Sequence, residues 1–156
     1  RVTVLTQNVD GLHRSAGSTD VIEIHGDLHD LRCTRCPWTE RVADYSALEL
    51  PPGCPRCSAV VRPEVVLFGE MLPSAAVDRL EDALRRGFDA VFSVGTTSLF
   101  PYVTAPVLLA RSRGGRTVEV NPAETTVSDV VDVRLRCGAA AALGAVAASI
   151  DRAGIR

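Results

Sequence analysis

The 156-residue chain contains no lysine, and all 17 of its basic residues are arginines. It therefore cannot be a substrate for chemistry on its own lysines. Aromatic residues make up only 4% of the sequence, so a hydrophobic core has to be built mainly from valine, leucine and alanine. The net charge of −2 gives no electrostatic attraction to nucleic acid or anionic lipid, and argues against both as direct partners.

Long apolar runs are also missing. None approaches the roughly 20 residues of a membrane-spanning helix, and no secretory signal is visible at the N-terminus. The five cysteines are an odd number, which argues against a disulfide framework and favours a cytoplasmic location. The length is that of one domain, or of one domain with a small insert.

Two short runs rich in β-branched residues, Val2–Thr6 and Val21–Ile24, predict strands near the N-terminus. Each run stops abruptly at polar residues, the first at Gln7–Asp10 and the second at His25. Polar side chains at the carboxyl ends of parallel strands are where an open α/β sheet binds its ligand. A histidine at such a position can titrate near neutral pH. We therefore expect the functional site at this edge.

Between Asp27 and Pro63 the hydrophobic periodicity disappears, and several prolines interrupt any long element. Two Cys-x-x-Cys pairs lie here, Cys33 with Cys36 and Cys54 with Cys57. Their spacing is that of a zinc ribbon, in which four thiolates complete a tetrahedron and leave no position open for substrate. We expect a structural zinc ion, the alternative being chance or redox pairs.

The rest of the sequence predicts alternating strands and helices. The expected strands are 65–69, 90–94, 117–120 and 131–135, and the expected helices are 73–86, 101–113 and one after Gly138. Strand 90–94 is apolar enough to predict burial. The small-residue turn that follows it, Gly95–Ser98, is a weak indication of a phosphate contact. The alternation predicts an α/β fold with a parallel sheet.

Several motifs, taken together and in order, resemble those of the sirtuins, the NAD-dependent protein lysine deacylases. They are Thr6–His13 (Thr-Gln-Asn-Val-Asp-Gly-Leu-His), Glu23–Gly26 (Glu-Ile-His-Gly), the four cysteines, Arg62–Pro73, Gly95–Thr97 and Val118–Asn121. The single small cysteine insert and the run Phe-Gly-Glu-Met-Leu-Pro resemble bacterial members. The family's opening Gly-Ala-Gly-x-Ser loop is absent, because this sequence starts after it.

The resemblance implies a Rossmann-like parallel sheet with helices on both faces, plus a small zinc-ribbon insert. Residues 1–26 and 64–156 would form the Rossmann-like NAD-binding domain, without its N-terminal part, and residues 27–63 the zinc-binding module. The implied cosubstrate is NAD, the implied metal is structural Zn²⁺, and the implied partner is an acyl-lysine protein or peptide. Oligomeric state cannot be read from the sequence.

His25 resembles the family's general base, which would activate a ribose hydroxyl, a proton transfer suited to imidazole. The residues implied to contact NAD are Gln7, Asn8, Val9, Asp10, Gly95, Thr96, Thr97, Asn121, Pro122, Ala123 and Cys137. The segment implied to pair with an acyl-lysine peptide as an added strand contains Val66, Phe68, Gly69 and Glu70. His13 and His29 are interpreted as structural or surface residues.

The implied reaction is transfer of the acyl group of acyl-lysine to ADP-ribose with release of nicotinamide. The alternatives are an NAD glycohydrolase or ADP-ribosyltransferase of the same fold, and a non-enzymatic zinc-bearing interaction module. The peptide segment favours the deacylase, because a glycohydrolase needs no peptide cleft.

The Gly-rich turn that holds the pyrophosphate in a Rossmann fold is not among these residues. We therefore expect residues 1–156 alone to bind NAD poorly and to catalyse little. We also expect an upstream or partner segment to complete the sheet, because an open apolar strand edge invites aggregation.

Overall fold

The computed structural model describes residues 1–154, which form two compact units that divide between Glu81 and Asp82. The first unit opens with a parallel pair of strands, β1 (Val4–Thr6) and β2 (Val21–Glu23), linked through the short helix α1 (Leu12–Ser15). Val21, Ile22 and Ile24 are almost inaccessible and form the core at this point. Both expected N-terminal strands are present, each somewhat shorter than expected.

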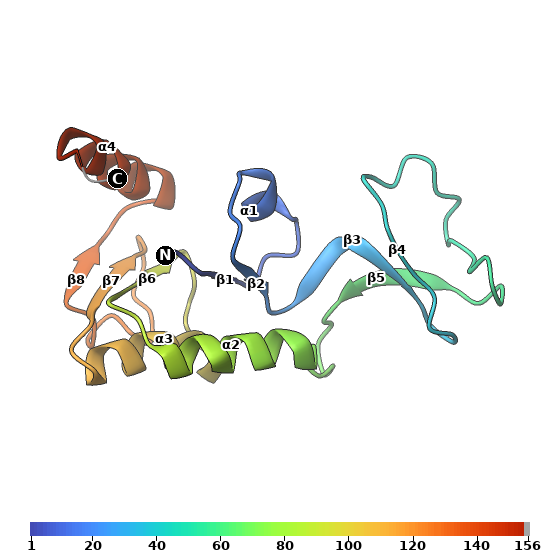
Figure 1. Cartoon of the computed structure of the whole chain (residues 1–156), viewed down its shortest axis with the longest axis horizontal. Coiled ribbons are helices and arrows are strands. Elements are labelled where there is room, and N and C mark those ends of the chain that lie inside the picture. The colour runs from blue at the N-terminus through green and yellow to red at the C-terminus, as the bar shows by residue number, and fades with distance from the viewer. Residues whose placement is uncertain (155–156) are drawn as a thin grey trace. The chain divides into compact units, whose positions relative to one another are not determined.

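A three-stranded antiparallel sheet follows in the same unit. β3 (Gly26–Cys33) lies in the middle and pairs with β4 (Thr39–Arg41) on one side and β5 (Val61–Val65) on the other (Figure 1). This sheet and its loop have their own core, in which Leu31, Val61 and two of the cysteines are buried and Trp38 packs against them. The region without clear hydrophobic periodicity is therefore an ordered module.

The expected strand 65–69 is wrong in its position. β5 ends at Val65, and the chain turns at Gly69, where φ is +84°. The strand includes Pro63, which pairs with Leu31 next to the point where the β3–β5 register shifts. Proline is tolerated beside such an irregularity, because the ladder there does not require a hydrogen bond from its nitrogen.

The second unit contains a three-stranded parallel sheet in the order β6 (Ala90–Val94), β7 (Arg116–Val120), β8 (Val133–Leu135). Helix α2 (Ser74–Arg86), within which the two units divide, precedes β6 and is followed by Gly87, whose φ is +80°. Helix α3 (Pro101–Ser112) packs on β6 and β7, and α4 (Ala139–Arg152) follows β8. The expected alternation of parallel strands and helices is confirmed.

One expectation for the second unit was too strong. β6 is only partly buried, and its Phe92 side chain is 44% exposed. Among the described residues β6 pairs only with β7, so it is an edge strand of its sheet. Across residues 1–154, no helix has both the length and the apolar character needed to cross a bilayer.

Gly26 marks the passage from β2 to β3, and we expect it to tolerate no side chain. Its φ is +82°, and a Cβ there would lie 1.9 Å from the backbone oxygen of Glu64. Gly26→Ala should lower the free energy of unfolding by about 2–4 kcal/mol, measured by urea denaturation. Gly17→Ala is the control, because Gly17 has φ +91° and no atom within 4 Å of the added Cβ. Equal losses in the two variants would contradict the steric argument.

Candidate functional site

The polar residues that follow β1 and β2 start from neighbouring strand ends. The Ile24 N–H donates to the Thr6 carbonyl oxygen at 3.1 Å, which ties the end of β2 to the end of β1. The Asn8 N–H donates to Thr6 Oγ1 at 3.1 Å, and Asp10 Oδ1 accepts the Leu12 N–H at 3.1 Å. Asn8 and Asp10 are exposed, whereas Gln7, Val9 and His25 are half-buried. The structure thus gathers this part of the predicted site.

His25 is also joined to the segment expected to bind peptide. Its carbonyl oxygen accepts the Val66 N–H at 2.9 Å. Phe68 is fully exposed at the turn that follows, whereas Glu70 is held by Arg62 through Nη1–Oε1 and Nη2–Oε2 contacts of 2.6 and 3.0 Å. The Glu70 carboxylate therefore stabilises the turn, and the side chains of Leu67, Phe68 and Met71 around it are exposed.

The ion pair with Arg62 lowers the pKa of Glu70 from 4.5 to about 2, with help from the Leu67 N–H. A carboxyl whose pKa is lower in the folded state stabilises the fold when ionised. This stabilisation is complete above pH 4.5 and is lost as the pH falls towards 2. We expect Glu70→Gln to flatten the decline of folding stability between pH 4.5 and 2, measured by urea titration at each pH. An unchanged decline would contradict the assignment.

A buried carboxylate two residues after His25 is the main feature that sequence reasoning missed. Asp27 is 2% exposed, and its Oδ1 accepts the backbone N–H and the ring Nδ1 of His29 at 2.9 and 2.8 Å. Its Oδ2 accepts from Arg41 Nη2 at 2.8 Å, and Arg41 Nη1 donates to Asp30 at 2.7 Å. Burial raises the pKa of Asp27, but the hydrogen bonds from His29 and Arg41 outweigh burial and lower it. The interpretation of His29 as structural agrees with these contacts.

The four module cysteines converge on one point. Their sulfur atoms all lie within 4.8 Å of one another, with Cys33–Cys57 at 3.5 Å and Cys36–Cys54 at 3.6 Å. A tetrahedral zinc with Zn–S bonds of about 2.3 Å requires sulfur separations of about 3.8 Å, close to these values. Backbone N–H groups of Arg35 and Cys36 donate to Cys33 Sγ at 3.4 Å, as Arg56 does to Cys54 Sγ. The cluster is compatible with a structural zinc ion.

The sulfurs of this cluster shift one another's pKa values. Burial raises the pKa of Cys33, but the N–H groups of Arg35 and Cys36 lower it to about 6. For Cys36 the Trp38 N–H lowers the pKa, whereas burial and the neighbouring sulfurs raise it to about 12. Four adjacent thiolates repel one another unless a cation lies between them.

In the second unit the candidate NAD residues lie at the carboxyl ends of three parallel strands. The Gly95 N–H after β6 donates to the Val120 oxygen at 3.0 Å, and Asn121 Nδ2 after β7 donates to the Thr96 oxygen at 3.0 Å. The Asn121 and Cys137 N–H groups both donate to the Leu135 oxygen, at 3.1 and 2.9 Å. Hydrogen bonds therefore join the segments that follow β6, β7 and β8 at the carboxyl edge of this sheet.

Both polar atoms of the Asn121 side chain form hydrogen bonds within the protein. Its side chain donates to Thr96, and its Oδ1 accepts the Ala123 N–H at 3.0 Å, which shapes the turn through Pro122. The loop beyond is anchored by Glu119, which is fully buried and accepts Ser128 Oγ at 2.7 Å while pairing with Arg134 at 3.0 Å. These partners are remote in sequence, and sequence reasoning did not find them.

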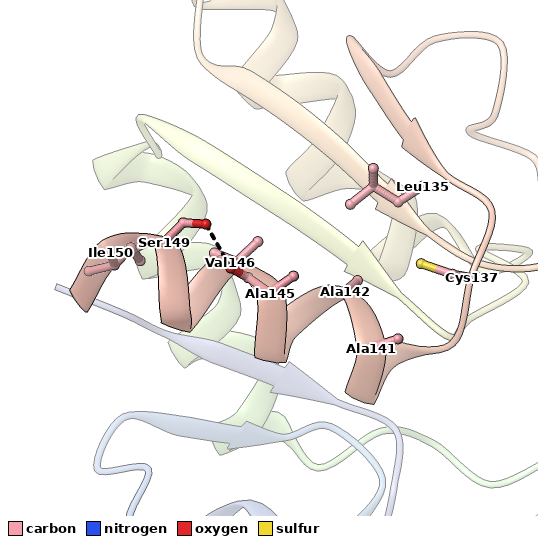
Figure 2. Close-up of a pocket in the computed structure, with 8 residues that line it drawn as sticks. All are labelled: Leu135, Cys137, Ala141, Ala142, Ala145, Val146, Ser149 and Ile150. Carbon is pink, nitrogen blue, oxygen red and sulfur yellow. Dashed lines mark hydrogen bonds between the residues drawn. The ribbon is translucent and has the colours of Figure 1, made fainter. Parts of the chain in front are cut away.

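A groove of about 570 Å³ runs along α4 from Cys137 (Figure 2). Figure 2 shows the side chains of Leu135 and Cys137 on one side and α4 residues between Ala141 and Ile150 on the other, with Ser149 Oγ bonded to the Ala145 oxygen at 2.8 Å. Cys137 is half-buried at its start. The groove is lined mainly by apolar side chains.

A family model described as "Sir2 family" matches residues 1–100, which is more than half of the chain. The chain belongs to the Sir2 family. This Sir2 chain is 52% identical over 135 residues to NAD-dependent protein deacylase 2 of Pseudomonas aeruginosa, covering 85% of this chain and 53% of that protein. It is 39% identical over 155 residues to the NAD-dependent protein deacylase of Pyrococcus abyssi, covering 96% and 61%.

Solved structures give the same family. The Sir2 chain matches the crystal structure of a Sir2 homolog–NAD complex with a TM-score of 0.89 and 36% identity, over 97% of this chain and 59% of that one. It matches a Sir2–p53 peptide–NAD⁺ structure with a TM-score of 0.82 and 31% identity, over 99% and 64%. The fold is thus the Rossmann-like α/β fold of Sir2 proteins, and the chain spans about half the length of the curated relatives it matches.

Proposed function

We propose that the protein is an NAD-dependent protein lysine deacylase, which transfers the acyl group of acyl-lysine to ADP-ribose and releases nicotinamide. The observation that carries the proposal is the connection of His25 to two segments. The bond from Ile24 to Thr6 links it to the strand end that leads into Gln7–Asp10, and the bond from Val66 links it to the turn at Phe68. A nicotinamide pocket and a peptide cleft would then meet at one histidine. The names of the relatives support the same reaction.

In this proposal the acyl oxygen attacks the ribose carbon that carries nicotinamide, and His25 then takes the proton of a ribose hydroxyl. Asn8 and Asp10 would hold the ribose and the nicotinamide carboxamide, because amide and carboxylate groups supply the donors and acceptors that a carboxamide needs. Gln7 and Val9 would line the same pocket. Val66, Phe68, Gly69 and Glu70 would receive the peptide, with Glu70 holding the turn through Arg62.

The second group of residues would bind the rest of NAD. The small-residue turn of Gly95, Thr96 and Thr97 would approach the phosphate or ribose. Asn121, Pro122 and Ala123 would contact the adenosine ribose, with the Asn121 side chain shaping the turn. The backbone at Cys137 would contact adenine. Their place at the carboxyl ends of parallel strands supports this assignment, because α/β sheets bind ligands there.

We also propose that Cys33, Cys36, Cys54 and Cys57 hold zinc within a module of residues 27–63, and that residues 1–26 and 64–156 belong to the NAD-binding domain. The separate core of the module supports this division. With four thiolates as ligands the metal supplies structure alone. A cytoplasmic location fits cysteines that converge for a metal and form no disulfide in the described chain.

The test is nicotinamide release from NAD, with and without an acetyl-lysine peptide. We expect release that depends on the peptide and does not occur with the same peptide carrying unmodified lysine. Release without peptide would identify a glycohydrolase instead. Transfer of labelled ADP-ribose to protein would identify an ADP-ribosyltransferase, and no turnover by the complete gene product would favour an interaction module.

A further inference from the structure

We propose that Asp27 is a positioning residue: held by Arg41 and paired with His29, it clamps the loop 8–11 onto β3, and so sets where Asn8 and Asp10 lie relative to His25. Its consequence for catalysis rests on the proposed function, whereas the clamp is a property of the fold.

Both oxygens of the Asp27 carboxylate are used inside the protein. One oxygen accepts hydrogen bonds from the backbone N–H and from the ring Nδ1 of His29. The other accepts a hydrogen bond from Arg41 Nη2. A carboxylate that is 2% exposed loses most of its hydration, and three charge-assisted or backbone bonds replace the lost water. The His29 ring is therefore held in one orientation.

The loop lies directly on this pair. A Cβ at Gly11 would lie 3.3 Å from His29 Nδ1 and 3.5 Å from Asp27 Oδ2, so the Gly11 backbone packs against both groups. The Leu28 N–H donates to the Val9 oxygen at 2.8 Å. These two contacts lie on either side of Asp10 in the chain. The φ of +68° at Gly11 is a conformation that residues with a side chain rarely adopt, and an added Cβ would pack tightly against His29.

The clamp and the proposed general base share one stretch of backbone. Asp27 follows His25 after a single residue, Gly26, whose conformation is fixed by close contact with Glu64. Movement of Asp27 would therefore change the position of the loop relative to His25. Small displacements of substrate-positioning groups can lower rates by about 10²-fold.

The chain supplies a matched control. Asp30 also accepts a hydrogen bond from Arg41, at 2.7 Å, but its side chain is 43% exposed, and within residues 1–154 it makes no hydrogen bond to the loop 8–11. In Asp27→Asn, Arg41 keeps its ion pair with Asp30. Because the Arg41 side chain is 52% exposed, no buried charge is left unpaired. We expect both variants to fold and to retain the module.

The first measurement is hydrogen exchange of the backbone amides in wild-type protein, Asp27→Asn and Asp30→Asn. The Leu12 amide donates to the Asp10 side chain, and the Leu28 amide donates to the Val9 carbonyl oxygen. We expect both amides to exchange about 10-fold faster in Asp27→Asn, and in that variant alone. The amides of the cysteine module should be unchanged. Unchanged exchange at both positions, or equal acceleration in Asp30→Asn, would overturn the clamp.

The second measurement is steady-state kinetics. Asp27→Asn should raise the KM for NAD about 10-fold and leave the KM for an acetyl-lysine peptide within about twofold, with Asp30→Asn like wild type. His29→Ala, which removes the ring but keeps the Asp27–Arg41 pair, should give the same split and serves if Asp27→Asn does not fold. Normal KM for NAD in both variants would overturn the role in catalysis. Faster exchange in a protein that never consumes NAD would refute the proposed function and leave the clamp standing.

Discussion

Replacing His25 by alanine is expected to lower the rate of deacylation by about 10²–10⁴, the usual contribution of a general base. The residue follows β2 and is bonded through its backbone to Val66, so loss of the imidazole leaves the backbone contact in place. The measurement is turnover of an acetyl-lysine peptide at saturating NAD. A near-normal rate in His25→Ala would show that another group accepts the proton.

Two controls separate chemistry from folding in this experiment. His13→Ala changes a half-buried histidine of α1 that the proposal gives no role, and should keep the wild-type rate. Exchange of labelled nicotinamide into NAD should fall less than deacylation in His25→Ala, because His25 is proposed to act after nicotinamide has left. Equal loss of both reactions would contradict that order of steps.

Replacing Cys54 by serine is expected to abolish stoichiometric zinc binding and to unfold the module around Trp38. Cys54 is 3% exposed and belongs to the module core, so metal binding and packing depend on the same side chain. Structural zinc sites contribute about 10–16 kcal/mol in small zinc domains, which is comparable with the whole stability of a typical domain. The measurements are zinc content by mass spectrometry and the fluorescence of Trp38, the single tryptophan of the chain.

Cys137→Ser is the matched control, because Cys137 is the one cysteine outside the cluster. It should retain one zinc per chain and wild-type Trp38 fluorescence. Zinc retained in Cys54→Ser, or wild-type protein purified without zinc under metal-free conditions, would contradict the assignment.

The parts of the fold that sequence reasoning predicted are those with strong local signals. Strand 90–94 is indicated by a continuous apolar run. Helix 101–113 is indicated by the proline at its start and the glycines after its end. The spacing of the two Cys-x-x-Cys pairs predicted the cysteine cluster. β5 was misplaced because Pro63 has low strand propensity, and only its pairing with β3 reveals why it is tolerated there.

The parts of the site that were missed depend on contacts between distant residues. The alternation Asp-Leu-His at 27–29 puts two polar side chains on one face of a strand, which is the one local indication of their bond. Nothing local indicates that Arg41 binds Asp27 and completes the network. Nor does the sequence around Glu119, which is flanked by two valines, indicate that its buried carboxylate binds Arg134 and Ser128. Such networks form only when the tertiary fold brings the partners together.

The most direct test of the account is the stoichiometry of products from the complete gene product, incubated with NAD and an acetyl-lysine peptide. Mass spectrometry should find nicotinamide, deacetylated peptide and acetylated ADP-ribose in equal amounts, with the acetyl label of the peptide recovered on ADP-ribose. Free acetate as the direct product, or ADP-ribose formed without loss of the acetyl group, would contradict acyl transfer to ADP-ribose.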